Sequence, residues 1–186
     1  MLSSGHYWYG EQVFGELGTR YFLRDALGIA AGLHEFFRNT DVFQMANYAQ
    51  TVNVIGAIKT TKTAAAFETT GLALKLYRQR FGTIPVVVSG DTGPLDVVAA
   101  WTEDRKAITV GVVNPTREAQ ELPFNLQGAK LTGKGRVWSI SGPDEMAYNH
   151  PGEAPKVTVV EQEISGVERS IKAQPVSVML FRLEVE

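Results

Sequence analysis

The sequence contains no cysteine, and this absence excludes disulfide bonds, thiolate metal ligands and a cysteine nucleophile. Histidine is also scarce. His6, His34 and His150 are the three histidines in 186 residues, and no two of them have the short spacing that a zinc-binding helix uses. We therefore expect a structural or surface role for each histidine, and we expect no metal site.

Neither sign of charge dominates, and long apolar runs are missing. The formal net charge is −2, the pI is about 6.0 and no run of lysine or arginine forms a basic stripe, so we expect no nucleic-acid partner. No apolar stretch approaches the ~20 residues that span a bilayer. The first residues, MLSSGHYWYGEQ, lack the cationic and apolar regions of a signal peptide. These absences predict a soluble, cytoplasmic protein without a membrane partner.

What is present is a globular composition, with 44% hydrophobic and 20% charged residues. The first part of the chain has the hydrophobic period of helices. Residues 20–38 place apolar side chains at three- and four-residue steps, which predicts a helix with one wide apolar face. Thr19 is the expected N-cap of this helix, and Asn39 is the expected stop.

A second helix is predicted over residues 64–80, with Thr63 as its cap. Gly71 inside it costs roughly 1 kcal/mol relative to alanine. That cost is either simply tolerated, or glycine is there so that another element can approach closely. Between the helices, the first few of residues 42–53 alternate loosely and predict one short strand.

After residue 83 the hydrophobic pattern changes to that of short strands separated by turns such as GDTGP, NPTRE and SGPDE. The last strand alternates cleanly, with Met179, Phe181 and Leu183 on one face and Arg182 on the other. Successive half-buried strands without helices between them predict a β-sandwich of antiparallel sheets. The expected strands cover residues 84–89, 95–102, 107–114, 120–126, 136–140, 156–161 and 176–184.

The predicted fold class is therefore α+β, in two domains. Residues 1–83 form a helix–strand–helix segment, and such units normally belong to a parallel sheet. A complete eight-fold α/β-barrel needs ~250 residues, so this segment can supply only a slice of one. Residues 84–186 form the β-sandwich. The chain thus has the organisation of a truncated protein.

The stretch VFQMANYAQTVN places four carboxamides, Gln44, Asn47, Gln50 and Asn53, at every third position. Short polar side chains of this kind routinely cap loops or satisfy backbone groups. A structural role is therefore the preferred interpretation for Gln44, Asn47 and Asn53. The three-residue recurrence is not itself evidence of chemistry.

The same region resembles a known family. The stretch DALGIAAGLHEFFRNTDVFQMANYAQTVNVIGAI, and above all ANYAQTVN within it, resembles the last barrel strand and its surroundings in family 51 glycoside hydrolases, the α-L-arabinofuranosidases. The resemblance continues through AFETTGLALKLYRQRFG and into AITVGVVNPT and SGPDEMAYNHPGEAPKV. It covers nearly the whole chain from about Gly18, with the segments in the same order.

This resemblance implies an α/β-barrel followed by a jelly-roll-like β-sandwich. It also implies retaining hydrolysis of terminal α-L-arabinofuranosyl groups in arabinan and arabinoxylan, with no metal or organic cofactor. Arabinose-containing saccharides are then the expected partners. Gln50 matches a glutamine that hydrogen-bonds the sugar at the carboxyl end of the last barrel strand. A carboxamide offers both a donor and an acceptor to a sugar hydroxyl.

The family's catalytic residues have no counterpart in this chain. A retaining glycosidase needs two carboxyl groups ~5–5.5 Å apart, and in the family these are a glutamate preceded by asparagine and a glutamate followed by tryptophan. Neither dipeptide occurs here. Glu11 and Glu16 precede the first helix outside any such motif, and we expect both to be solvated. We therefore assign no catalytic residue and expect the isolated chain to be inactive.

Two non-catalytic functions remain as alternatives. The sandwich is either a carbohydrate-binding module or an oligomerisation module. Trp101, Trp138, Tyr148 and Phe124 are the aromatic side chains available for a sugar platform, but strand alternation favours core positions for Trp101 and Trp138. A partial barrel also leaves an apolar face and a strand edge uncovered, and such surfaces promote association. We therefore expect either a homo-oligomer or a rearranged N-terminal half.

Overall fold

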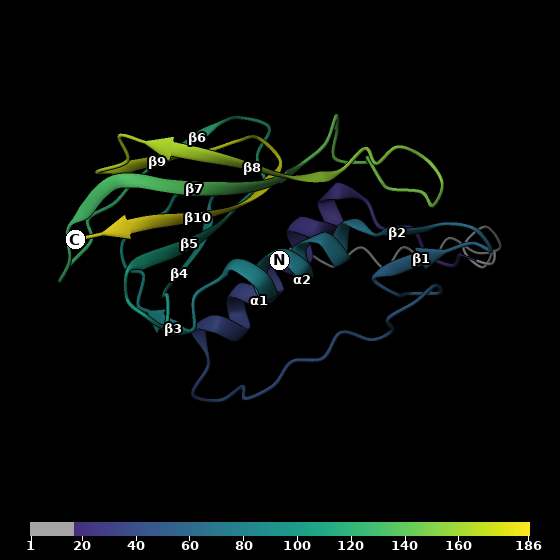
Figure 1. Ribbon diagram of the computed structural model, residues 1–186, viewed down its shortest axis with the longest axis horizontal. Helices are drawn as coiled ribbons and strands as arrows, with labels where there is room; N and C mark the ends of the chain where they lie inside the picture. Colours follow the sequence, from purple (N-terminus) through teal and green to yellow (C-terminus); the bar gives the residue numbers. More distant parts are fainter. Residues whose placement is uncertain (1–16) are drawn as a thin grey trace.

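The computed structural model describes residues 17–186, so His6, Glu11 and Glu16 lie outside the described part of the chain. The secondary structure follows the predicted order of helices and then strands (Figure 1). The elements are α1 (Leu23–Arg38), β1 (Ile58–Thr60), β2 (Ala65–Phe67), α2 (Thr69–Arg80), β3 (Ile84–Val86), β4 (Asp96–Trp101), β5 (Ala107–Asn114), β6 (Gln120–Pro123), β7 (Leu131–Ser141), β8 (Thr158–Ser165), β9 (Ser170–Ala173) and β10 (Ser177–Val185).

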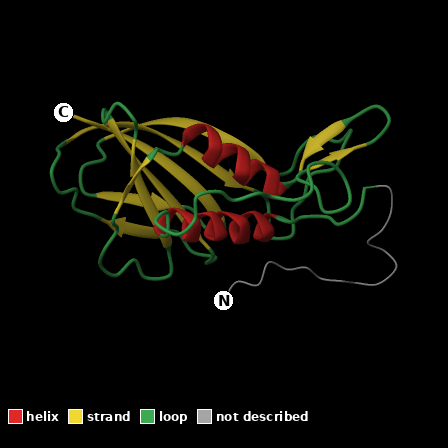
Figure 2. Cartoon of the chain, turned by 90° about the horizontal axis from the view of Figure 1, so that it is seen from below, coloured by secondary structure: helices red, strands yellow, loops and turns green. Residues whose placement is uncertain are grey.

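The main sheet has six strands in the order β3-β4-β5-β10-β7-β8, and every neighbouring pair is antiparallel. Both helices cover one face of this sheet, and the two-stranded sheet β6–β9 lies over the other (Figures 1 and 2). The sheets β1–β2 and β6–β9 are also antiparallel. The fold is therefore a mixture of helices and antiparallel sheets, and residues 17–186 form no closed barrel.

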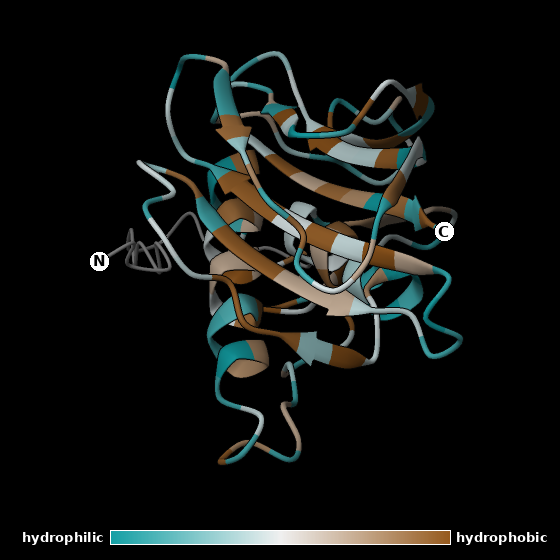
Figure 3. Ribbon diagram, turned by 90° about the vertical axis from the view of Figure 1, so that its left-hand side faces the viewer, coloured by the Kyte–Doolittle hydropathy of each residue, from teal (hydrophilic) through white to brown (hydrophobic). Residues whose placement is uncertain are grey.

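Strand β10 shows how the sheet is buried on both faces. Met179, Phe181 and Leu183 pack toward β6–β9, as their alternation predicts. Val178 and Leu180 point the other way and are fully buried beneath the helices. The prediction of half-buried strands is thus wrong for this strand, because β5 and β7 flank it in the middle of a sheet covered on both sides. Hydrophobic residues accordingly recur along the strands (Figure 3).

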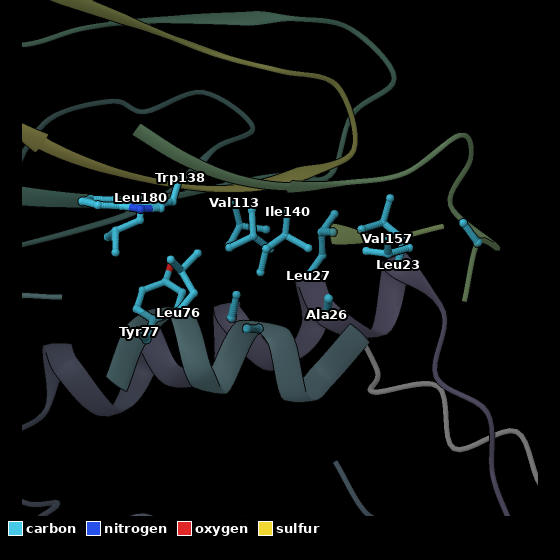
Figure 4. Close-up of a cluster of buried hydrophobic side chains, with 14 residues drawn as sticks. Leu23, Ala26, Leu27, Leu76, Tyr77, Val113, Trp138, Ile140, Val157 and Leu180 are labelled. Carbon is cyan, nitrogen blue, oxygen red and sulfur yellow. The ribbon is translucent and has the colours of Figure 1, made fainter. Parts of the chain in front are cut away.

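The core between helices and sheet joins the two halves of the sequence (Figure 4). Side chains of α1 and α2 point at the sheet and meet side chains of β5, β7 and β10. Full burial of each leucine or valine contributes ~1.5–3 kcal/mol. The labelled members of this cluster are Leu23, Ala26, Leu27, Leu76, Tyr77, Val113, Trp138, Ile140, Val157 and Leu180.

Helix α1 begins later than its predicted cap. The N-cap residue is Phe22 rather than Thr19, because the Asp25 carboxylate accepts the backbone N–H of Phe22 at 2.7 Å. A carboxylate in the first turn also suits the positive end of the helix dipole. The C-cap is Asn39, as predicted. Neither helix in residues 17–186 has the length and apolar content to cross a membrane.

The region between the helices differs most from the prediction. Residues 42–50 form no strand, since no strand of the described chain pairs with them, and Val42 and Met45 are 69% and 76% exposed. The strand pair β1–β2 forms later and includes residues 65–67, which were predicted to be helical. Helix α2 consequently begins after Glu68, and Thr63 is not its cap. The short strand β9 was not predicted.

A buried polar chain links the helices to the sheet. His34 is fully buried on α1, with Nδ1 3.0 Å from the Asp96 carboxylate and Nε2 2.5 Å from the Tyr77 hydroxyl. Burial lowers the pKa of His34 against the opposing influence of Asp96. The neutral imidazole therefore donates from Nδ1 to Asp96 and accepts the Tyr77 O–H at Nε2. Gly111 makes room for this chain, because a Cβ there would lie 2.8 Å from the Tyr77 oxygen.

We expect His34→Ala to lower the free energy of unfolding by ~2–4 kcal/mol. The substitution leaves a cavity, and it leaves the buried Tyr77 hydroxyl without its acceptor. The measurement is urea unfolding followed by circular dichroism. Glu35→Ala is the matched control, because the neighbouring Glu35 side chain is 65% exposed and its pair with Arg38 is a surface pair. Equal losses in the two variants would contradict a special role for His34.

Candidate functional site

Gln50 lies on the irregular segment of residues 40–57, which runs apart from the main sheet (Figure 1). Its side chain is exposed, and the peptide bond before it is cis. It lines a shallow groove with a volume of about 320 Å³, between this segment and the outer face of α2. The other lining residues are Tyr48, Thr51, Ala57, Ile58, Phe67, Gly71, Leu74, Lys75 and Arg78.

Backbone hydrogen bonds fix the position of Gln50. Its carbonyl oxygen accepts the N–H of Ala57 at 3.3 Å, and the carbonyl oxygen of Thr51 accepts the N–H of Ile58 at 3.0 Å. The Tyr48 hydroxyl lies 3.4 Å from the Thr70 hydroxyl on α2. The backbone around Gln50 is therefore tied to β1 and α2, while its side chain stays available to a ligand.

Gly71 allows this close packing. A Cβ at Gly71 would lie 2.4 Å from the carbonyl oxygen of Ala57. That same oxygen accepts the backbone N–H of Glu68 at 2.9 Å, so the segment cannot retreat without losing a hydrogen bond at the start of α2. Of the two interpretations open for Gly71, close approach of another element is confirmed.

A buried ionisable cluster lies behind the groove. Lys59 and Glu68 are each only 2% exposed. The Lys59 ammonium donates to the carbonyl oxygen of Val54 at 3.0 Å, and the Glu68 carboxylate accepts the N–H of Tyr21 at 3.1 Å. Burial raises the pKa of Glu68 to about 7, although the Tyr21 N–H and Lys59 oppose the shift. Burial also lowers the pKa of Lys59. The cluster holds residues 54–68 against the start of α1.

The other carboxamides of the segment differ from Gln50. Asn53 is a structural residue, as expected, because its Oδ1 accepts the backbone N–H of Thr60 at 2.8 Å. This bond holds Asn53 itself, whose φ is positive at 52°, beside β1. Gln44 and Asn47 are exposed and do not line the groove. The structure thus brings one of the four amides into the groove.

Within residues 17–186, no carboxyl group lines the groove. Its described lining contains neither aspartate nor glutamate, and Lys75 and Arg78 are its charged groups. Across residues 17–186, no group of three or more histidine, aspartate or glutamate side chains is placed to hold a metal ion. The arrangement can bind a polar ligand, but it does not supply a pair of carboxylates.

The four aromatic residues considered for a sugar platform lie apart. Trp138 is 4% exposed in the core beneath the helices, as alternation predicts. Trp101 and Phe124 are partly buried against the core on the opposite face. Tyr148 is half-buried, with its ring 5.9 Å from the ring of Phe22 and cations at 4.9 and 5.5 Å from its centroid. These four residues form no continuous exposed platform.

Sequence patterns missed the Lys59–Glu68 cluster because both side chains are of types that normally face solvent. The available signal was the position of Lys59 within the apolar run VIGAIK, between Ile58 and Thr60. A lysine in such a run is either at a strand edge or buried with a partner.

The sequence comparisons with known proteins point to one family. A sequence profile described as "Alpha-L-arabinofuranosidase C-terminal domain" matches residues 7–177. "Probable alpha-L-arabinofuranosidase C" from Aspergillus flavus is 34% identical over 164 residues, which is 78% of this chain and 32% of the relative. "Alpha-L-arabinofuranosidase C" from Emericella nidulans is 31% identical over 151 residues, covering 72% of this chain and 29% of the relative. The chain thus spans about a third of the length of these relatives.

Solved structures give the same result. The α-L-arabinofuranosidase from Thermotoga maritima, determined in complex with arabinose, superposes with a TM-score of 0.80 and 26% identity. The superposition covers 91% of this chain and 40% of that one. A family 51 α-L-arabinofuranosidase from Thermotoga petrophila has the same fold over the same shares, with a TM-score of 0.78 and 24% identity.

We expect Gly71→Ala to lower the free energy of unfolding by ~1–3 kcal/mol, because the new methyl group collides with a backbone carbonyl that is already hydrogen-bonded. Gly28→Ala is the matched control. Gly28 lies inside α1 with nothing within 4 Å of the added Cβ, so alanine there should stabilise by roughly 0.5–1 kcal/mol. Urea midpoints that move in the same direction for both variants would refute the packing argument.

We expect Glu68→Gln to change how stability depends on pH. The Glu68 pKa is about 7 in the folded chain against an ordinary 4.5, so rising pH ionises the unfolded state first. Below pH 4.5 Glu68 therefore leaves the free energy of unfolding unchanged. Between pH 4.5 and 7 it lowers that free energy progressively, and above pH 7 the loss is complete. The stability of the variant relative to the original chain should rise across that window by up to about 3 kcal/mol.

The measurement for Glu68→Gln is urea unfolding at pH 4.5, 6 and 8. Glu35→Gln makes the same change in net charge at an exposed position and serves as the reference. A stability difference for Glu68→Gln that stays constant from pH 4.5 to 8 would show that Glu68 ionises normally.

Proposed function

The chain belongs to the family of α-L-arabinofuranosidase C-terminal domains, and on that premise we propose that it is the non-catalytic, substrate-contacting end of an arabinan- and arabinoxylan-degrading enzyme. In this proposal residues 1–83 supply a slice of the catalytic barrel and residues 84–186 a jelly-roll-like sandwich. The enzyme releases terminal arabinofuranosyl groups with retention of configuration. The rest of the barrel provides both catalytic carboxyl groups.

One observation carries the proposal. Gln50 is exposed in a groove to which residues 17–186 contribute no aspartate or glutamate. A neutral amide there can donate to and accept from the hydroxyl groups of one sugar. It cannot protonate a leaving group or attack an anomeric carbon, and both steps are needed for double displacement. The geometry therefore supports substrate binding by this chain and catalysis by another part of the enzyme.

The exposed apolar side chains of the same segment indicate that another part of the enzyme, or another chain, packs over it. Val42, Phe43 and Met45 are 69%, 46% and 76% exposed, and Val52 is 46% exposed. Apolar surface of this extent normally marks an interface. In the proposed enzyme the remaining barrel strands cover it. For the chain alone we propose that a second copy covers it, which gives a homo-oligomer.

We expect the purified chain to release no nitrophenol from 4-nitrophenyl α-L-arabinofuranoside. To test Gln50, the chain is joined behind the catalytic part of a family member such as the Thermotoga maritima enzyme. Gln50→Ala should lower kcat/KM of this hybrid about 3- to 10-fold, as the loss of one net hydrogen bond predicts.

Gln44→Ala is the matched control, because Gln44 is an exposed amide on the same segment outside the groove. It should leave kcat/KM unchanged, and neither variant should alter the melting temperature. Turnover by the purified chain itself, or equal kinetics in the Gln50→Ala and Gln44→Ala hybrids, would contradict the proposal.

A further inference from the structure

A second groove, with a volume of about 480 Å³, lies on the other side of Phe67. One wall is the outer face of α2, with Lys75, Gln79 and Arg80. The opposite wall is the connection between β7 and β8, which lies beside β2 in Figure 1. We call this hollow the α2–β8 groove. Its size is that of a small-molecule site.

Asn149 holds the far wall of the groove in place. This buried amide accepts the backbone N–H groups of Lys156 and Val157 at 3.0 and 2.9 Å. Its own NH2 donates to the carbonyl oxygens of Val157 at 2.8 Å and Phe67 at 3.3 Å. One side chain therefore closes the 149–157 loop and ties it to β2. The wall is set before any ligand arrives.

Trp138 forms part of the floor. Its indole Nε1 is buried without a hydrogen-bond partner among the described residues, although it interacts favourably with the nearby Glu161 carboxylate. The Arg80 guanidinium lies 5.0 Å from the ring centroid, and Arg80 and Glu161 are 3.9 Å apart. A buried N–H without a close hydrogen-bond partner is costly in a folded protein, and a group bound beside it is one explanation.

The polar groups around this floor suit a neutral ligand. The groove is lined by the cations of Lys75 and Arg80 and by the carboxylates of Glu153 and Glu161, so its formal charges balance. Gln79 adds both a donor and an acceptor. An anion or a cation would meet a group of its own sign here. A polyhydroxylated molecule finds donors and acceptors for its hydroxyls and an apolar surface for its C–H faces.

The α2–β8 groove adjoins the Gln50 groove. Phe67 and Lys75 line both of them, so these two side chains form the wall that the hollows share along one edge of α2. Phe67 is 37% exposed, and the Lys75 ammonium lies 5.1 Å from its ring centroid. A linear chain of sugars bound at Gln50 would reach the second groove by crossing this exposed ring.

We propose that the α2–β8 groove binds a neutral linear oligosaccharide, the backbone of the polysaccharide whose terminal arabinose contacts Gln50. The choice of ligand rests on the proposed function, but the site itself stands on its own geometry. Gln79 and Glu161 hydrogen-bond the sugar hydroxyls, and the exposed side chains of Phe67 and Pro155 supply the apolar surface. The groove thereby holds polymeric substrate on the sandwich side of the enzyme.

The test is titration of the ¹⁵N-labelled full chain with xylohexaose, arabinohexaose or hexagalacturonate, followed by NMR. We expect at least one neutral hexasaccharide to shift amide signals of residues 75–80 and 149–161, and we expect the anionic hexagalacturonate not to do so. The double variant Gln79→Ala/Glu161→Gln should bind the neutral sugar about 3- to 10-fold more weakly per lost hydrogen bond.

Two further variants serve as a control and as a second test of the groove. Gln162→Ala is the matched control, because Gln162 follows Glu161 on β8 and, by strand alternation, points to the opposite face. It should bind as the original chain does. Trp138→Phe keeps an aromatic ring in the core and removes the indole N–H, so the variant should stay folded with some loss of stability and bind the sugar more weakly. Equal affinity of the double variant and Gln162→Ala would overturn the proposal, as would the absence of shifts in the groove with both neutral sugars.

The same titration separates this site from the Gln50 site. Gln50→Ala should leave the shifts at residues 75–80 and 149–161 in place. If those shifts persist while the Gln50→Ala hybrid keeps full activity, the proposed function fails and the groove proposal holds. If shifts occur only around residues 48–58, the groove proposal fails and the proposed contact at Gln50 is supported.

Discussion

The packing of α1 and α2 against one face of the six-stranded sheet is the interaction on which the rest of the structure depends. Apolar side chains from both halves of the sequence form one cluster there. The His34 imidazole crosses this cluster and joins Asp96 on β4 to Tyr77 on α2. Apolar burial supplies the free energy, and the polar chain fixes which turn of each helix faces which strand.

This packing also determines where Gln50 lies. Helix α1 ends at Arg38, and residues 40–57 run from that end to β1 along the outside of the core (Figure 1). Apart from one bridge between Val52 and Ile58, the segment joins no sheet and is held by single backbone hydrogen bonds, by the close contact at Gly71 and by the Lys59–Glu68 cluster. Its apolar side chains consequently remain exposed. The groove is the space between this segment and α2.

Sequence patterns predicted those helices and strands in which buried residues recur at the regular spacing of the element itself. The strand alternation of β10 and the stripe of α1 arise from neighbours that repeat every two or every three to four residues. Residues 42–50 show why the rest failed, because alternation makes a strand only where a partner supplies the hydrogen bonds. The predicted cap of α2 was wrong because a long-range contact determines where the helix begins: the backbone N–H of Glu68 donates to the carbonyl oxygen of Ala57. Gln50 was singled out by resemblance to a family, and its spacing carries no information about its position in a groove.

The charges in the Gln50 groove fit a division of tasks within the proposed enzyme. A retaining glycosidase depends on two carboxyl groups whose pKa values differ because each feels the charge of the other. A third carboxylate beside the same sugar would raise both pKa values and weaken the nucleophile. A carboxamide makes the same hydrogen bonds without that effect, and Lys75 and Arg78 favour ionised carboxylates nearby. In the proposed enzyme, a chain without catalytic carboxyl groups can therefore still assist catalysis, by binding the sugar through a neutral side chain that adds no negative charge beside the carboxyl pair.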